Sequence, residues 1–170
     1  LANPTDMQGE NWRTCCYNVT NGGPLTDIRD YASNAAARAN FRRELRYFVA
    51  RWAYSTSVFS WNLWNEVNWM PDFSPEKYVG WHREMAAYLK QIDWAGHIVH
   101  TNYGKINDVP ALDGLPEMQI VSTNTYGMKD FTPVAETWTR HFMEKYHKPA
   151  IFGEYGIGHR MGPDGYAPHD

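Results

Sequence analysis

Short apolar segments rich in β-forming residues alternate along this chain with longer segments of helical periodicity, and this alternation limits the possible folds more than any other feature. Strands that alternate with helices form a parallel sheet covered by those helices. The pattern predicts an α/β fold, which a doubly wound sheet and a (β/α)8 barrel satisfy equally. No Gly-x-Gly-x-x-Gly motif follows any predicted strand, so the dinucleotide-binding version of the doubly wound fold lacks its signature.

Helices are predicted where apolar residues recur at helical spacing behind a capping residue. The first starts at Ser33 or Asn34 and runs to about Tyr54. The second opens at Ser74-Pro75, an N-cap followed by proline at the first helical position, and the third at Thr132-Pro133.

Strands are predicted where short runs are apolar and rich in β-branched or aromatic residues, which applies to 58–64, 97–101, 119–123 and 149–152. The range 1–33 contains many glycine, proline and asparagine residues, and we expect a long βα loop with at most one helical turn. We expect 159–170 to be a loop or tail.

The composition limits the classes of partner. A length of 170 residues predicts one domain, and a formal net charge of −3 gives no electrostatic reason to expect nucleic acid or an anionic membrane. No apolar run approaches the roughly 18 residues of a membrane span. Aromatic residues make up 15% of the chain, and rings with a polar edge suit sugar-binding surfaces, although most of them are expected in the core.

Polar side chains follow every predicted strand, at the end where active-site residues of a barrel lie. Two of them, Glu66 and Glu154, are acidic and lie three predicted strands apart, which is across the mouth of a closed barrel. The residues at these strand ends are Asn65, Glu66, Asn102, Asn124, Tyr126 and Glu154.

Two segments resemble a known family. Trp-Asn-Leu-Trp-Asn-Glu, ending at Glu66, resembles the fourth strand of clan-A retaining glycoside hydrolases, and Lys-Pro-Ala-Ile-Phe-Gly-Glu, ending at Glu154, resembles their seventh strand. Residues 45–52 and 115–118 are also similar to the cellulase and mannanase group, family five and its relatives. The resemblance implies one partial catalytic domain over 1–170, a (β/α)8 TIM barrel reduced to about strands four to seven, because a whole barrel needs about 250 residues.

The resemblance implies a retaining glycosidase that cleaves a β-1,4-linked polysaccharide, cellulose-like or mannan-like, with Glu66 as acid/base and Glu154 as nucleophile. Retaining enzymes use two carboxyl groups about 5–5.5 Å apart, and their mutual repulsion keeps one of them protonated. The alternatives are a non-catalytic carbohydrate-binding barrel derivative and a plain structural domain. Binding alone does not require both glutamates. The fragment by itself is expected to be inactive, because the missing strands contribute half of the cleft.

The remaining site residues are expected around the glutamate pair. Asn65 is expected to bond the sugar 2-hydroxyl, and Tyr126 is expected to orient Glu154. Asn124 stands where many relatives have histidine. The further substrate-binding candidates are Asn102, Trp69 just past the acid/base strand as a stacking platform, and Trp12 in the first loop.

No metal site and no cofactor are expected. The sequence contains no His-x-x-x-His pair with an acid between, and His97 and His100 have the wrong alternation for two ligands on one strand face. Cys15 and Cys16 are adjacent, so they cannot close an ordinary disulfide loop and are expected to be structural thiols. The resemblance alone favours a secreted or periplasmic location.

Overall fold

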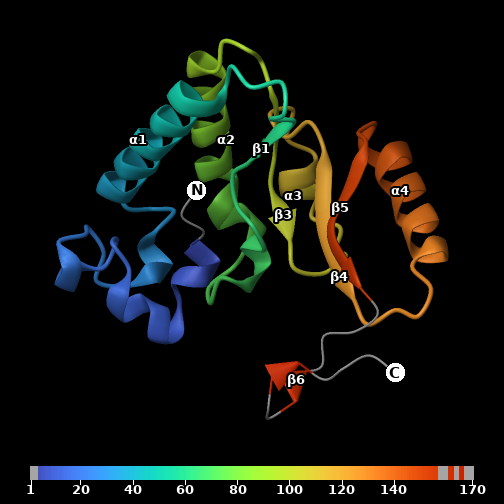
Figure 1. Cartoon of the computed structure of the whole chain (residues 1–170), viewed down its shortest axis with the longest axis horizontal. Coiled ribbons are helices and arrows are strands. Elements are labelled where there is room, and N and C mark those ends of the chain that lie inside the picture. The colour runs from blue at the N-terminus through green and yellow to red at the C-terminus, as the bar shows by residue number, and fades with distance from the viewer. Residues whose placement is uncertain (1–3, 157–160, 163–164, 167–170) are drawn as a thin grey trace.

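The computed structural model describes residues 4–156, 161–162 and 165–166, and it is an α/β structure whose main strands are parallel (Figure 1). β1 pairs with β2, β3 with β4, and β4 with β5, all in parallel. The strands are β1 (Ser60–Asn62), β2 (Ile98–His100), β3 (Asn102–Tyr103), β4 (Val121–Tyr126) and β5 (Ala150–Gly156).

The two parallel sheets are joined into one. β2 and β3 are separated only by Thr101, and the backbone of Asn102 donates to the carbonyl of Trp64 at 2.8 Å, beyond the end of β1. Strand order therefore follows chain order, from β1 through β2 and β3 to β4 and β5. A doubly wound sheet reverses its strand order at a switch point, whereas a barrel adds each strand on the same side. The order fits a segment of a barrel.

The helices lie outside this sheet (Figure 1), and the first two start where their capping residues predict. The Asn34 side chain accepts from the backbone of Ala36 and Ala37, and Ser74 accepts from Lys77 with proline at the first helical position. None of the helices in the described ranges is long and apolar enough to cross a membrane. The helices are α1 (Ala35–Trp52), α2 (Pro75–Ile92), α3 (Pro110–Asp113) and α4 (Thr132–Tyr146).

The expectation of at most one helical turn in 1–33 is wrong. Four 3-10 helices occupy this segment, and side chains cap two of them: Asn18 accepts from Thr20, and Asp27 accepts from Arg29. Turns this short bury no periodic apolar face, so no helical periodicity marks them in the sequence. The 3-10 helices are η1 (Pro4–Met7), η2 (Gly9–Thr14), η3 (Val19–Asn21) and η4 (Ile28–Asp30).

The predicted tail 159–170 lies mostly outside the described residues. Within it, β6 (Met161–Gly162) and β7 (Gly165–Tyr166) pair in antiparallel fashion.

An aromatic cluster forms the core where α1, α2 and the 3-10 region meet the end of β1. Trp64 lies 4.9 Å from Trp81 and 5.3 Å from Tyr31, measured between ring centroids, and Phe41 lies 4.9 Å from Trp81. All four side chains are fully buried. Because Trp64 stands two residues before Glu66, this packing anchors the backbone that carries the first glutamate.

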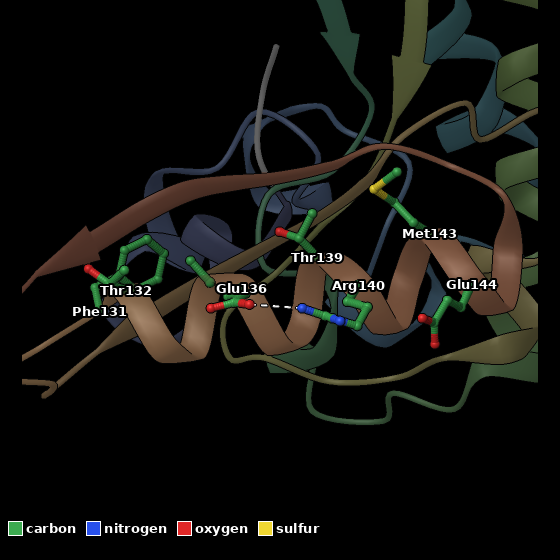
Figure 2. Close-up of a pocket in the computed structure, with 8 residues that line it drawn as sticks. Phe131, Thr132, Glu136, Thr139, Arg140, Met143 and Glu144 are labelled. Atoms are coloured by element: carbon green, nitrogen blue, oxygen red, sulfur yellow. Dashed lines mark hydrogen bonds and ion pairs between the residues drawn. The ribbon is translucent and has the colours of Figure 1, made fainter.

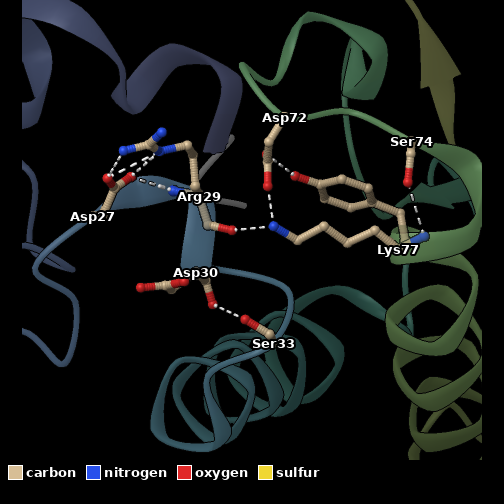
Figure 3. A network of polar contacts seen from close by, with 8 residues as sticks. Asp27, Arg29, Asp30, Ser33, Asp72, Ser74 and Lys77 are labelled. Atoms are coloured by element: carbon tan, nitrogen blue, oxygen red, sulfur yellow. Dashed lines mark hydrogen bonds and ion pairs between the residues drawn. The ribbon is translucent and has the colours of Figure 1, made fainter.

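A polar network ties the 3-10 region to the loop that precedes α2 (Figure 3). Lys77 donates to the carbonyl of Arg29 at 2.8 Å and forms an ion pair with Asp72, which also accepts from the Tyr78 hydroxyl at 3.0 Å. The network holds the segment directly after η5 (Val67–Trp69) against η4.

Candidate active site

Glu66 stands at a sharp change of chain direction after β1. Its backbone is left-handed, with φ 56° and ψ 45°, a conformation that non-glycine residues adopt uncommonly and that often marks a functional position. Its carbonyl accepts from the backbone of Trp69 at 2.9 Å, which closes η5. The half-buried side chain accepts a hydrogen bond from Asn124 Nδ2, with 3.0 Å between Nδ2 and Glu66 Oε1.

Glu154 lies inside β5 rather than after it, and a β-bulge sets the face to which it points. β5 pairs with β4 as Phe152 opposite Thr123 and then Glu154 opposite Asn124, so that Gly153 is the extra residue. Residues paired across neighbouring strands share a face of the sheet. The bulge therefore puts Glu154 on the face of Asn124. Without the extra residue, regular alternation would have put Glu154 on the opposite face of the sheet.

Ring contacts on the opposite face agree with the bulge. Phe152 and Tyr155 are three residues apart, yet both contact Phe131, with ring centroids 4.9 Å and 4.6 Å away. In a regular strand two residues with an odd spacing point to opposite faces. The extra residue between them brings both rings to the helix side.

Asn124 connects the two glutamates. Its side chain donates to Glu66, and its backbone is the in-register neighbour of Glu154. The hydroxyl of Tyr126 donates to Glu154 Oε2 from the same strand. The two acidic side chains of the predicted pair, 88 positions apart in the sequence, are thus linked through one asparagine at one edge of the parallel sheet.

Asn102 and Asn124 are buried, which differs from an exposed substrate-binding position. Their side chains are 2% and 0% exposed. Asn102 Nδ2 donates to Asn124 Oδ1 at 2.9 Å and to Ser122 Oγ at 3.0 Å. These three side chains form a polar layer directly behind Glu66.

Burial lowers the pKa of both histidines near this layer. Burial lowers the pKa of His82 to about 4, and its ring nitrogens bond the Tyr78 carbonyl and the Thr101 hydroxyl. Burial also lowers the pKa of His100, whose Nε2 lies 3.1 Å from Ser60 Oγ. The strands behind the glutamates therefore bring no histidine cation to the site.

The aromatic candidates differ in exposure. Trp69 is 48% exposed in η5, lies against Gly104, and has Lys105 Nζ 5.2 Å from its ring centroid. Trp12 is half-buried and packs against the core, so packing explains it as well as sugar binding does. Asn65 is half-buried directly before Glu66.

A groove of about 680 Å³ lies elsewhere, along the outer side of α4 (Figure 2). Its acidic residues are Glu136, which is paired with Arg140, and Glu144, and neither belongs to the glutamate pair. Across the described ranges, no group of three or more His, Cys, Asp or Glu side chains is arranged to hold a metal ion. The residues that line this groove include neither Glu66 nor Glu154.

Comparison with known proteins gives one sequence match and several structural ones. No protein-family profile matches the chain. A stretch of 67 residues, 39% of the chain and 15% of its relative, is 33% identical to mannan endo-1,4-β-mannosidase A of Hypocrea jecorina. An exo-β-1,4-mannosidase of Opitutaceae bacterium strain TAV5 superposes with a TM-score of 0.57 at 13% identity, over 84% of this chain and 30% of that one.

A β-glucuronidase of Bifidobacterium dentium, solved with coumarin-3-O-glucuronide, superposes with a TM-score of 0.55 at 17% identity, over 73% of this chain and 21% of that one. The findings fit a partial clan-A glycosidase. The structural neighbours are glycoside hydrolases with a TIM-barrel-type fold. This chain spans less than a third of the length of each relative.

Sequence reasoning missed several residues of this site. Gly153 creates the bulge, and a glycine inside a strand pattern is the signal that predicts one. Ser122 is the last member of the buried polar layer. It stands two positions before Asn124 in β4, so the alternation of a strand predicts that both side chains lie on one face. Asn68 accepts from the Gly104 backbone at 2.7 Å and so holds the loop under Trp69, a contact that no local sequence pattern indicates.

Proposed function

We propose that this chain is the part of a retaining β-glycosidase that carries both catalytic carboxylates, on barrel strands four to seven, and that the whole enzyme cleaves a β-1,4-linked polysaccharide. The observation that carries the proposal is the double role of Asn124, whose side chain bonds Glu66 and whose backbone neighbours Glu154. Two carboxylates at one edge of a parallel sheet are what double displacement requires.

In this mechanism Glu154 attacks the anomeric carbon while Glu66 gives its proton to the leaving oxygen. The glycosyl group is then bonded to Glu154, and the electrons of the broken bond stay with the leaving oxygen. Water next attacks the same carbon, gives a proton to Glu66 and releases Glu154. The Tyr126 hydroxyl holds one oxygen of Glu154, which leaves the other oxygen to act as the nucleophile.

The substrate we propose is a mannan-like or cellulose-like polysaccharide. Support comes from two similar proteins, an endo-1,4-β-mannosidase and an exo-β-1,4-mannosidase. The exposed ring of Trp69 offers a flat surface on which a sugar can stack, three residues after the acid/base. Asn65 is our candidate for the hydrogen bond to the sugar 2-hydroxyl, which strengthens in the transition state.

Two substitutions in the full-length enzyme test the proposal. Glu154→Ala should abolish turnover of mannan and of cellulose, because no other residue replaces the nucleophile. Glu66→Ala should abolish polysaccharide hydrolysis but still release a good leaving group such as dinitrophenol, which needs no proton. Glu136→Ala, in the exposed ion pair of α4, is the matched control.

Unchanged polysaccharide turnover in both glutamate variants would refute the roles. Binding of mannan without hydrolysis by the wild-type enzyme would instead identify the chain as a carbohydrate-binding derivative of a barrel. Measuring affinity and turnover on the same preparations separates these outcomes.

A further inference from the structure

The buried polar layer behind Glu66 is a directed chain of hydrogen bonds. Asn102 Nδ2 donates to Ser122 Oγ and to Asn124 Oδ1, and Asn124 Nδ2 donates to Glu66 Oε1, with donor–acceptor distances between 2.9 and 3.0 Å. Ser122, Asn102 and Asn124 are 1%, 2% and 0% exposed. Groups this deeply buried do not exchange these partners for solvent.

We propose that Asn102 is a positioning residue for the acid/base. Through Asn124 it keeps a hydrogen-bond donor on Glu66 Oε1, and it thereby confines the transferable proton of Glu66 to Oε2. This inference rests on the proposed function and adds to it the atom that carries the proton.

The direction of the chain follows from the chemistry of amides. A primary amide has a donor end and an acceptor end, so turning one amide forces its neighbour to turn as well. A proton on Glu66 Oε1 would need Asn124 Oδ1 in front of it. Asn124 Nδ2 would then point at Asn102, which would have to present Oδ1 in return.

The reversed arrangement leaves more buried groups unpaired. At present Asn102 Oδ1 has no hydrogen-bond partner among the described residues, so one acceptor is unsatisfied. Reversal would move both N–H groups of that amide to this same place, and two buried donors would lack an acceptor. Unpaired buried donors are costly, so the observed direction is the stable one.

This arrangement has a consequence for the reaction cycle. Glu66 loses its proton to the leaving oxygen in the first step and recovers one from water in the second. With Oε1 engaged by Asn124 in both states, both transfers use Oε2. The titratable side chains on the neighbouring strands are Tyr103 on β3, Tyr126 on β4, Glu154 and Tyr155 on β5, and His100 on β2, whose pKa burial lowers.

Asn102→Asp in the full-length enzyme tests the inference, because aspartate has the same shape but accepts at both oxygens. Asn124 should turn its NH2 toward it and present Oδ1 to Glu66, which favours the protonated acid. We expect the basic limb of the kcat/KM profile to move to higher pH. We also expect kcat to fall about tenfold for substrates whose rate is limited by hydrolysis of the glycosyl-enzyme intermediate.

Two further variants separate the effect of the hydrogen-bond direction from the effects of the added negative charge and of altered side-chain packing. Asn102→Leu removes the donor without adding a charge, and it should slow hydrolysis of polysaccharide more than hydrolysis of dinitrophenyl glycosides. Ser122→Ala shortens the chain at its far end but keeps its direction, so the basic limb should stay in place. An unmoved basic limb in Asn102→Asp, or equal losses on polysaccharide and dinitrophenyl glycosides in Asn102→Leu, with turnover still abolished by Glu154→Ala, would overturn this inference and leave the proposed function intact.

A readout without turnover guards against variants that fail to fold. In protein labelled with 15N, the side-chain amide resonance of Asn124 should move with pH in the wild type and stay fixed in Glu66→Gln. A resonance that moves equally in both proteins would also overturn the inference. If Glu154→Ala retained turnover, the proposed function would fail independently of this test.

Discussion

The Tyr126 hydroxyl donates a hydrogen bond to Glu154 Oε2 from the neighbouring strand; Tyr126 ends β4, and Glu154 lies two residues before the end of β5. Glu154 is exposed, so this contact restrains a side chain that solvent would otherwise leave free. The orientation of the proposed nucleophile therefore depends on a neighbouring phenol, and the dependence can be measured.

Tyr126→Phe should lower kcat more than it changes KM, since it removes a hydrogen bond to a charged group and keeps the ring. The loss of roughly 1.5–3 kcal/mol corresponds to about ten- to a hundredfold in rate. Steady-state kinetics on mannan oligosaccharides would measure it. Tyr155→Phe is the matched control, because that ring stacks on Phe131 on the opposite face. Equal losses in the two variants would contradict the orienting role.

Gly153→Ala should destabilise the fold and the site together. An added Cβ would lie 3.1 Å from both Asn102 Nδ2 and Asn124 Oδ1, tighter than ordinary contact. We expect a loss of about 1–3 kcal/mol in the free energy of unfolding, measured by urea titration. Gly156→Ala is the control, because its Cβ would lie 3.5 Å from the Tyr126 ring. A fully stable and active Gly153→Ala enzyme would argue against the tight bulge.

Trp69→Ala should weaken binding of mannan oligosaccharides by about tenfold if the ring is a stacking platform. Gly104→Ala should have a similar effect with the indole still present, because the new Cβ would overlap the ring of Trp69. Trp94→Ala, at a residue 77% exposed and remote in sequence from the glutamates, is the control. Calorimetric titration gives the three affinities, and an unchanged affinity in the first two variants would exclude Trp69 from the cleft.

Asp113→Asn should make stability less dependent on pH. Burial raises the pKa of Asp113 from 3.8 to about 6, while its Oδ2 accepts from the backbone of Val109 at 2.8 Å. Because the folded pKa is the higher one, the contribution to stability is complete below about pH 4 and is lost as the pH rises through about 6. The difference amounts to at most roughly 3 kcal/mol at neutral pH.

The variant should therefore be more stable than the wild type at pH 7 and similar to it at pH 4, because asparagine stays neutral and can still accept from Val109. Urea titrations at the two pH values give the free energies of unfolding. A wild-type protein whose stability rises from pH 4 to pH 7 by the same amount as that of the variant would contradict this assignment.

Helix starts were predictable from sequence because capping is local. Asn34 and Ser74 each satisfy backbone donors within three residues, so the signal and its effect lie in one short segment. The strands were located, but their ends were not: β1 ends at Asn62, whereas β5 continues through Glu154. Strand ends depend on partners far away in sequence, which a single strand cannot reveal.

The sequence was sufficient to predict which two glutamates form the pair, but not how their side chains are oriented. The side of the sheet to which Glu154 points depends on an extra residue at Gly153, and counting by twos from Ile151 gives the wrong face. The left-handed backbone of Glu66 likewise cannot be read from the identity of the residue, because glutamate rarely adopts it. The burial of Asn102 and Asn124 also appeared only with the fold.

The aromatic core has a consequence for how the molecule opens. In the described ranges, the main hydrophobic cluster runs from Cys15 to Met118 and includes no residue of α4 or β5. Protection from amide exchange should therefore be highest around Trp64 and lowest along β5, where few side chains are fully buried. A transient opening of β5 would carry Glu154 away while Glu66 stays fixed, so the proposed nucleophile would leave its position more often than the proposed acid/base.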